Sequence, residues 1–269
     1  MVASALVAVP SALVATGAQA NDLLIAPTRL MFEGRTRSTE VILKNIGVKA
    51  ATYRVSLVAR RMTPEGGIEE PETLNEAEAL AEKMIRFAPR RVQLEPNQPQ
   101  AVRIAVRKPA DLASGEYRIH MLFRAIPEVA DLTEASAQAE AENAMAIRLT
   151  AIYGITIPLI VRHGDLEGGA MIDSASLQSK DAERVFNIGL QRLGDRSVYG
   201  DVVVEKDGIK EPVAQTRGIA IYPEVAARTL QMAVNPAYDG PMTGTAMVRY
   251  YEEKDGKRVL LAEQPVTLG

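Results

Sequence analysis

The chain has 269 residues, of which 47% are hydrophobic, so it can bury a sizeable core in one large or two ordinary domains. A formal net charge of -3, an aromatic content of 4% and the absence of Trp exclude a basic, base-stacking surface for nucleic acid. No cysteine is present, which excludes disulfides, thiol catalysis and cysteine-based zinc sites.

The first 20 residues are small and apolar and end in Ala18-Gln19-Ala20, the A-x-A pattern of a signal-peptidase site. We therefore predict a secretory signal peptide over residues 1–20 and an exported mature protein. A signal peptide normally begins with a basic region, but no Lys or Arg precedes Asn21. The alternative is a disordered or membrane-anchoring N-terminus, although the apolar run is short for a spanning helix and Pro10 interrupts it.

Residues 23–62 contain short runs of alternating apolar residues that are broken by Gly34 and Gly47. This spacing of strands and turns is typical of an antiparallel sandwich. Arg29 stands inside the first apolar run. An arginine set into a strand is either an edge residue whose charged end reaches solvent or a buried receptor for an anion.

Two segments, residues 65–84 and 127–145, are acidic and rich in Ala and Glu. The first predicts a loop with a helical turn or two between strands, which is either an ordinary solvated loop or a loop that contacts a partner. The second joins two predicted strands and has little hydrophobic bulk, so we expect it to be mobile until a partner orders it.

Ile147 to Arg162 reads as one long strand. Apolar side chains alternate with polar or small ones, and Gly154 and Pro158 argue against a helix. Strands usually run about 3 to 10 residues, so a strand of this length is expected to pair in more than one sheet or with more than one partner. The apolar row is either buried in the protein's own core or offered from a free edge to an incomplete partner. Its members are Ile147, Leu149, Ala151, Tyr153, Ile155 and Ile157.

Beyond Gly164 a short acidic, glycine-rich link precedes a second series of short apolar runs. We therefore predict an N-terminal domain over residues 21–164 and a C-terminal domain over residues 165–269. Both are expected to be immunoglobulin-like β-sandwiches, which makes the protein all-β. The hairpin signals of the second domain are Asp207-Gly208, Asp239-Gly240 and Asp255-Gly256.

Four segments, in order, resemble the PapD-type periplasmic pilus chaperones of the chaperone–usher pathway. They are Thr28–Gly34, which resembles the family's opening strand, Phe87–Val106, Gly115–Pro127 and Ile147–Arg162. Together they span almost all of residues 23–163. The resemblance implies two sandwiches in an L-shaped arrangement and a periplasmic chaperone that completes pilus subunits by donor-strand complementation and delivers them to an outer-membrane usher. The free edge strand also allows the unbound protein to associate with itself.

In this family an arginine of the first strand and a lysine of the last bind the terminal carboxylate of a subunit. Arg29 matches the arginine, and a guanidinium suits a carboxylate because it offers a planar fork of donors. The lysine is not matched, because Pro158 stands in its place. The resemblance assigns the donor-strand contacts with the subunit to Ile147, Leu149, Ala151 and Tyr153.

The resemblance further places Glu116, Arg162 and Asp239 in a charged cluster that links the two domains; the alternative is ordinary exposed charges. The segment 127–145 is longer than in the short-loop members of the family, which leaves the subfamily open.

We expect no enzyme, no cofactor and no metal. The two histidines, His120 and His163, form no recognised ligand motif, and no nucleophile or phosphate-loop motif occurs. A metal-dependent hydrolase is therefore a remote alternative. A structural or adhesive surface protein of two sandwiches, whose long strand is internal, is the main alternative to a chaperone.

Overall fold

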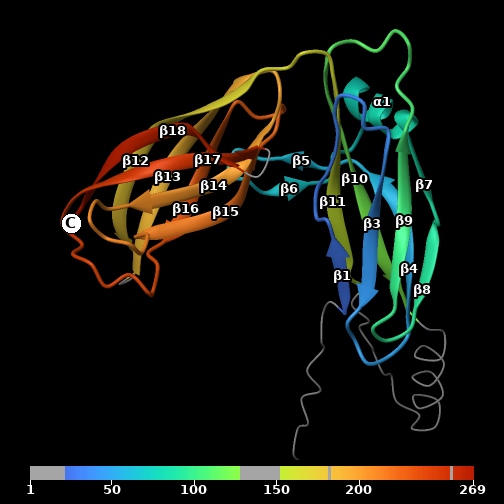
Figure 1. Ribbon diagram of the computed structural model, residues 1–269, viewed down its shortest axis with the longest axis horizontal. Helices are drawn as coiled ribbons and strands as arrows, with labels where there is room; N and C mark the ends of the chain where they lie inside the picture. Colours follow the sequence, from blue (N-terminus) through green and yellow to red (C-terminus); the bar gives the residue numbers. More distant parts are fainter. Residues whose placement is uncertain (1–21, 128–151, 181–182, 255–256) are drawn as a thin grey trace, which may run out of the picture.

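The computed structural model describes residues 22–127, 152–180, 183–254 and 257–269. Two β-sandwiches lie at an angle to each other and are joined at one end (Figure 1). The predicted all-β architecture of two sandwich domains is thereby confirmed. The predicted signal peptide and most of the segment 127–145 lie outside the described residues. No helix in the part of the chain that the structure describes is long and apolar enough to cross a membrane.

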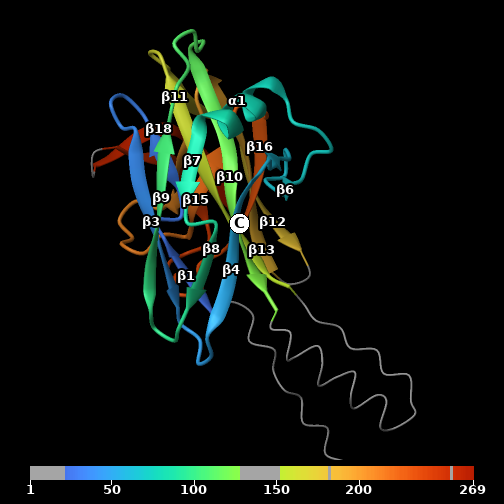
Figure 2. The same ribbon diagram turned by 90° about the vertical axis from the view of Figure 1, so that its right-hand side faces the viewer.

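Two sheets form the first domain, and Figure 2 shows them packed face to face. One has the order β1 (Leu23–Ala26), β3 (Ser38–Asn45), β9 (Pro99–Val106) and β7 (Ile85–Ala88). The other has the order β2 (Leu30–Phe32), β11 (Gly154–His163), β10 (Gly115–Ile126), β4 (Ala51–Val58) and β8 (Arg91–Leu94).

The first apolar run is divided between the two sheets. β1 pairs with β3 in one sheet, whereas β2 runs parallel to β11 in the other. Pro27 lies between β1 and β2 and has no backbone N–H for a ladder, so the run is interrupted there. Arg29 therefore stands where the chain has crossed from one sheet to the other, directly before β2.

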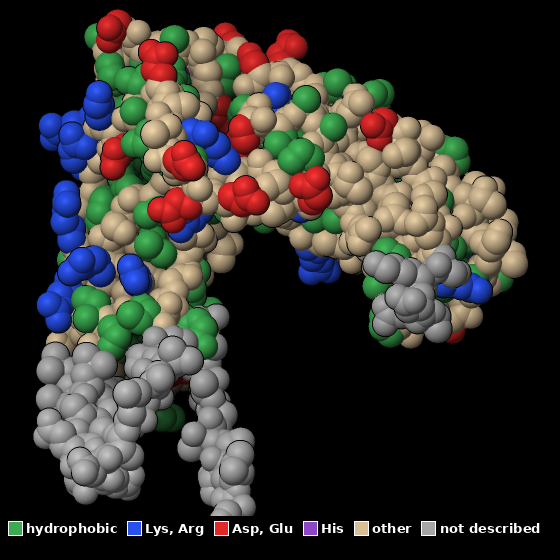
Figure 3. All heavy atoms as spheres, turned by 180° about the vertical axis from the view of Figure 1, so that it is seen from behind, with side chains coloured by type: hydrophobic (Ala, Val, Ile, Leu, Met, Phe, Trp, Pro, Cys, Tyr) green, Lys and Arg blue, Asp and Glu red, His purple; other side chains and the backbone are tan. Residues whose placement is uncertain are grey.

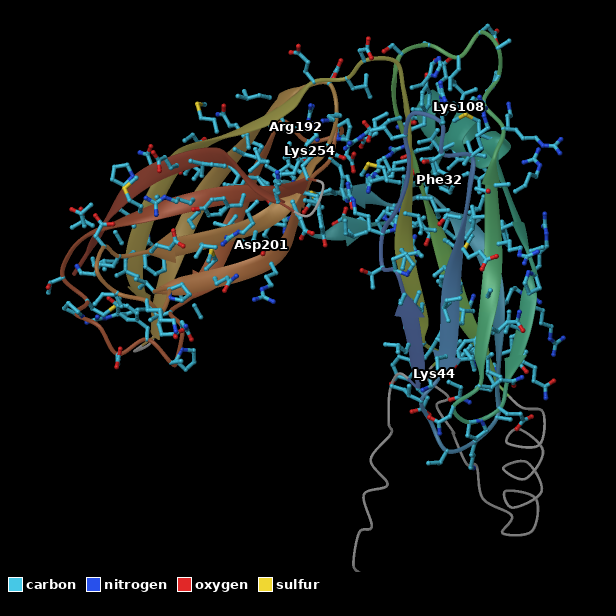
Figure 4. The ribbon with its side chains drawn as sticks, in the orientation of Figure 1. Phe32, Lys44, Lys108, Arg192, Asp201 and Lys254 are labelled. Atoms are coloured by element: carbon cyan, nitrogen blue, oxygen red, sulfur yellow. The ribbon has the colours of Figure 1, made fainter. Side chains whose placement is uncertain are left out.

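The core of the first domain lies between the inner faces of its two sheets. The alternation predicted from the sequence is visible in β3, where Val41 and Leu43 are fully buried. Phe32 of β2 is also fully buried, and Figure 4 places it in the interior of this domain. Ile157 and Leu159 of β11 belong to the same core.

The acidic segment 65–84 contains the helix α1 (Glu76–Met84). Asn75 accepts a hydrogen bond from the backbone of Glu78, and the Glu78 carboxylate accepts one from the backbone of Asn75, which caps the first turn. Ala81 and Met84 are buried on the side that faces β10 and β7. The helical turns that the sequence predicts thus close the end of the first sandwich.

The second domain also has two sheets. One has the order β12 (Gly168–Lys180), β13 (Glu183–Gly194) and β16 (Ala227–Ala233). The other has the order β15 (Ala214–Ile221), β14 (Val198–Glu205), β17 (Gly244–Lys254) and β18 (Lys257–Leu268). Phe186 and Tyr250 are fully buried in the core between them. The Tyr250 hydroxyl, within that core, donates to the carbonyl of Ile219 at 2.7 Å.

A hairpin of the first domain reaches across to the second. It consists of β5 (Arg61–Met62) and β6 (Ile68–Glu69), which Figure 1 shows between the two sandwiches. Met62 is buried in the core cluster of the second domain, as is Ile160 of β11. The backbone N–H of Thr229 donates to the carbonyl of Pro64 at 2.8 Å. The two domains therefore share apolar and backbone contacts as well as the linker.

Replacing Phe32 with Ala should lower the free energy of unfolding by about 3 to 5 kcal/mol, because it removes a fully buried ring and leaves a cavity. Urea denaturation followed by circular dichroism measures this change. Val48→Ala is the control, since Val48 is 88% exposed and its loss should change the free energy by less than about 0.5 kcal/mol. Equal effects of the two substitutions would contradict the placement of Phe32 in the core.

Candidate functional site

Arg29 extends from the first domain to the second. Its Nη1 donates to the Tyr222 hydroxyl at 3.1 Å, and its Nη2 donates to the Ser197 hydroxyl at 3.3 Å. The guanidinium lies 4.6 Å from the centre of the Tyr199 ring and 5.5 Å from that of Tyr222. Its Nε is buried and has no hydrogen-bond partner among the described residues. Arg29 is thus held between hydroxyls and aromatic faces, and no described carboxylate pairs with it.

Two nearby arginines are paired with carboxylates, Arg118 across the junction and Arg60 within the first domain. Arg118 forms an ion pair with Glu224 of the second domain, and its guanidinium lies 3.6 Å from the centre of the Tyr222 ring. Arg60 pairs with Glu70 at 2.5 Å. Arg29, in contrast, has no carboxylate partner among the described residues, and neither does Arg228 of the second domain, which lies against Gly66 and donates to the carbonyl of Ala220.

The neighbouring His120 reports the positive potential of this region. Burial is the main cause that lowers the pKa of its imidazole from 6.5 to about 3, so the ring is neutral near pH 7. The positive charges of the three nearby arginines lower this pKa further. A pocket of positive potential disfavours a proton on the imidazole and favours an added anion for the same electrostatic reason.

Pro158 stands beside Arg29 in the sheet. Leu159 is the parallel register partner of Leu30, so the residues that precede this pair, Pro158 and Arg29, are neighbours. On its other side Pro158 faces His120 of β10. The position that carries a lysine in the resembled family therefore supplies no charge in this chain.

One edge of β11 is free over part of its length. β10 pairs with all of β11, whereas β2 pairs only with Leu159–Val161. The carbonyl of Tyr153 accepts from the N–H of Ala125 in β10, so strand alternation turns the backbone groups of Gly154 and Thr156 to the other side. No described strand pairs with them there. This is an open edge that can accept another strand.

The apolar row predicted as the donor strand is only partly within the described residues. Ile147, Leu149 and Ala151 lie outside them. Tyr153 is described and is 44% exposed, whereas Ile157 is buried in the protein's own core. The row therefore changes role along the strand: its later members belong to the first domain, and Tyr153 faces outward next to the open edge.

Arg162 is the centre of a buried ionic cluster that joins the domains. Its Nε donates to Glu116 Oε2 at 2.9 Å, and its Nη2 donates to the carbonyl of Ser197 at 3.0 Å. Glu116 Oε2 also accepts from the N–H and the hydroxyl of Ser197, at 3.1 and 2.8 Å. The side chains of Arg162 and Glu116 are only 7% and 0% exposed. Glu116 and Arg162, which were expected in such a cluster, contact each other and the second domain.

Lys108 adds a further contact near the linker, because its ammonium donates to the carbonyl of Arg162 at 2.5 Å. Figure 4 shows Lys108 at the end of the first domain that is next to the linker.

The structure does not bring Asp239 to this cluster, contrary to the expectation. Asp239 is exposed in the loop between β16 and β17. β17 begins at Gly244, opposite Leu268, and Figure 1 shows this C-terminal end of the second domain far from the first. Its place in the cluster is taken by Ser197, which binds through its backbone and hydroxyl. A lone serine before a strand gives no sequence signal for this role.

The two histidines do not meet. His120 faces Pro158 and His163 faces Gly115, so they are five residues apart along the β10–β11 ladder, or about 17 Å. In the described ranges no group of three or more His, Cys, Asp or Glu side chains could hold a metal ion.

Comparisons with known proteins concern the fold. No family model and no curated protein matches the sequence. Among solved structures, the chain is similar to the YadV chaperone, at 15% identity over 92% of this chain and 100% of that chain, with a TM-score of 0.46. It is also similar to the CsuC–CsuE chaperone–tip adhesion subunit pre-assembly complex of Acinetobacter baumannii, at 11% identity over 91% and 98%, with a TM-score of 0.47.

A third similar structure is the CupB2 chaperone of Pseudomonas aeruginosa, at 14% identity over 91% of this chain and 100% of that chain, with a TM-score of 0.45. Each of the three structures contains a chaperone, and the second comes from chaperone–usher pili. At such identities the likeness is one of fold.

Glu116→Ala should lower the free energy of unfolding by about 3 to 5 kcal/mol, because it leaves the buried Arg162 guanidinium without its main counter-ion. Urea denaturation at pH 7 measures the loss. Asp239→Ala is the matched control, and as an exposed change it should stay within about 0.5 kcal/mol. A larger effect at Asp239 than at Glu116 would overturn this description of the cluster.

The stability of the protein should also depend on pH through His120. Its folded pKa of about 3 lies below the unfolded value of 6.5, so protonation favours the unfolded state and stability falls as the pH drops from 7 toward 3. Between pH 7 and pH 5 this one group should remove about 2 kcal/mol. His120→Gln should abolish that part of the pH dependence in urea denaturation, and His163→Gln should retain it. Identical pH profiles for wild type and His120→Gln would contradict the burial of a neutral imidazole.

Proposed function

We propose that this protein is a periplasmic chaperone that holds a pilus subunit at the junction of its two domains and passes it to an outer-membrane usher. The observation that carries this proposal is that a cation without a described counter-ion and a strand edge without a described partner lie next to each other. Arg29 has no described carboxylate partner, and it stands beside the open edge of β11. A client that ends in a carboxylate and lacks a strand would satisfy both.

Arg29 is suited to a terminal carboxylate. Its guanidinium keeps its charge when partly desolvated and can donate two parallel hydrogen bonds to one carboxylate. Its present partners, the hydroxyls of Tyr222 and Ser197, are neutral. A carboxylate would therefore replace hydrogen bonds to neutral hydroxyl oxygens with hydrogen bonds between opposite charges. Burial, and after it the positive charges of nearby arginines, lower the pKa of His120 in the same region.

The open edge of β11 would provide the backbone contacts. A client strand laid along Gly154 and Thr156 would pair with their outward N–H and C=O groups, which is β-augmentation. In this proposal the row that includes Tyr153 fills the groove that the missing client strand leaves. Burial of each large apolar side chain contributes about 1.5 to 3 kcal/mol, so several together offset the ordering cost of association. The other members of that row are Ile147, Leu149 and Ala151.

The second domain has a positioning role in this proposal. Ser197 and Tyr222 hold the Arg29 guanidinium, and both belong to the second domain. Ser197 is also a partner of Arg162 in the interdomain cluster. The orientation of Arg29 therefore depends on the angle between the domains. A single sandwich would lack the two side chains that orient Arg29 toward a client's carboxylate.

Arg29→Ala should abolish recovery of a co-expressed cognate subunit from the periplasm, because the anchor for its carboxylate is lost. Recovery is measured by affinity purification of the chaperone and immunoblotting of the subunit. Arg29→Lys should restore it only in part, since a lysine keeps the charge but loses the fork. Arg103→Ala is the control, because Arg103 is exposed on the other sheet and pairs with Glu40.

The thermal transition of purified Arg29→Ala should remain cooperative, which separates loss of binding from loss of folding. Unchanged recovery of the subunit would favour the alternative of a two-sandwich structural or adhesive protein.

A further inference from the structure

Three arginines form a row across the outer face of the five-stranded sheet. Arg124 of β10 is the register partner of Arg54 of β4, and Arg54 is the register partner of Arg91 of β8. All three are exposed. Their neighbours in each strand, Val55 and Phe123 among them, point into the core, so the three guanidinium groups share the opposite face. We call Arg91, Arg54 and Arg124 the arginine row.

Two other cross-strand arginines face a carboxylate, although Lys254 and Lys257 at the end of the β17–β18 ladder also form a like-charge pair. Arg103 of β9 faces Glu40 of β3, and the pair is joined at 2.8 Å. Arg249 of β17 likewise faces Glu263 of β18 at 3.1 Å. Like charges directly opposite each other destabilise a sheet. No carboxylate among the described residues lies within ion-pair distance of any member of the row.

The row borders a groove on this face of the first domain. The groove has a volume of about 910 Å³ and runs over β4, β10 and the start of β11. Its lining combines Arg54 and Arg124 with apolar side chains such as Leu122, and it also contains the Arg60–Glu70 ion pair. Figure 3, which views the molecule from behind, shows Lys and Arg side chains along the outer part of the first domain and acidic side chains nearer the second. An acidic residue with apolar neighbours fits such a groove.

The register relates the row to Arg29. Arg124 faces Gly154, and Pro158, four residues later in β11, stands beside Arg29. At about 3.3 Å per residue, the two levels are about 13 Å apart. Gly154 has no side chain of its own, and Leu122 occupies the space where one would lie, so the path from Arg124 to the open edge crosses an apolar surface. Consider a client strand that lies on this edge parallel to β11 and ends level with Pro158 and Arg29. Counting its last residue as the first, its fifth residue from the end is level with Gly154 and therefore with the arginine row.

We propose that the arginine row is a specificity site for an acidic side chain at the fifth residue from the carboxyl end of the client strand. This inference rests on the proposed chaperone function and names the class of client that this chain prefers. Residues at one level of adjacent strands point to the same face, so that side chain lies over the groove. Arg124 is two strands from that residue, about 10 Å, and Arg54 is three strands away, about 14 Å. The carboxylate of that residue therefore accepts hydrogen bonds from Arg124, and Arg54 adds a longer-range attraction that relieves the repulsion within the row.

The probe is a set of soluble ten-residue peptides with alternating Thr and Val, a free carboxyl terminus and a fluorescent N-terminal label. Glu, Gln or Lys occupies the fifth position from the end, and a fourth peptide has Glu at the fourth position, which points to the opposite face. Fluorescence anisotropy measures binding to the full protein. The Glu peptide should bind about 3- to 10-fold more tightly than the Gln peptide, as a partly exposed charge-assisted contact provides, and the Lys peptide more weakly still. Glu at the fourth position should give no gain.

The double variant Arg54→Gln/Arg124→Gln should bind the Glu and Gln peptides equally, whereas Arg103→Gln should keep the preference. A Glu preference that persists in the double variant would overturn the inference, as would no preference in the wild type. Amidation of the peptide terminus tests the Arg29 anchor separately. Binding that depends on the free terminus but not on Glu overturns only the specificity site, whereas binding that ignores amidation overturns the proposed function itself.

Discussion

The structure depends on the buried contact between Arg162 and Glu116, which Ser197 of the second domain completes. Bringing two charges out of water is expensive, and their attraction repays it only when further hydrogen bonds satisfy both partners. Here the serine provides such bonds to the Arg162 guanidinium from its carbonyl and to Glu116 Oε2 from its N–H and its hydroxyl, while the buried Glu116 Oε1 has no partner among the described residues. A contact with such strict geometry contributes little net stability but permits few angles between the domains.

Apolar contacts reinforce the same angle. Met62 of the β5–β6 hairpin and Ile160 of β11 are buried in the core cluster of the second domain. The backbone of Met62 donates to Glu224, which is also the partner of Arg118. The first domain thus inserts side chains into the second from the β5–β6 hairpin and from β11. With the angle held in this way, Tyr222 and Ser197 reach Arg29 at hydrogen-bond distance.

Arginines at the junction and on the sheet differ in their partners. Arg162 and Arg118 both contact the second domain and are paired, with Glu116 and with Glu224. Arg29 and the arginine row lack such partners among the described residues. Both arrangements are costly for an isolated protein. For Arg29 the cost is a buried nitrogen without a hydrogen bond to any described residue, and for the arginine row it is the repulsion between like charges. Both features are explained if a partner supplies what is missing, which is the common basis of the proposed function and of the proposed specificity.

The amino-acid sequence by itself determined the local structure. The period of two in residues 23–62 and in the strand that ends at His163 predicted strands, because alternate side chains must reach one face. It also marked Arg29 as unusual, since a charge within an apolar run needs a partner or solvent. It left open whether Arg29 faced solvent or an anion site, and the cap of α1 by Asn75 and Glu78 went unrecognised although the pattern is local.

Only the tertiary structure decided which distant residues meet. Arg29 and Tyr222 are separated by 193 positions, and Glu116 and Ser197 by 81. Nothing in the local pattern of a lone serine or tyrosine records such a contact, and the expected role of Asp239 failed for that reason. Strand register and the interdomain angle set these contacts, and both result from the packing of the whole chain. Periodicity is a property of neighbours in sequence, whereas a site between domains is a property of the assembled fold.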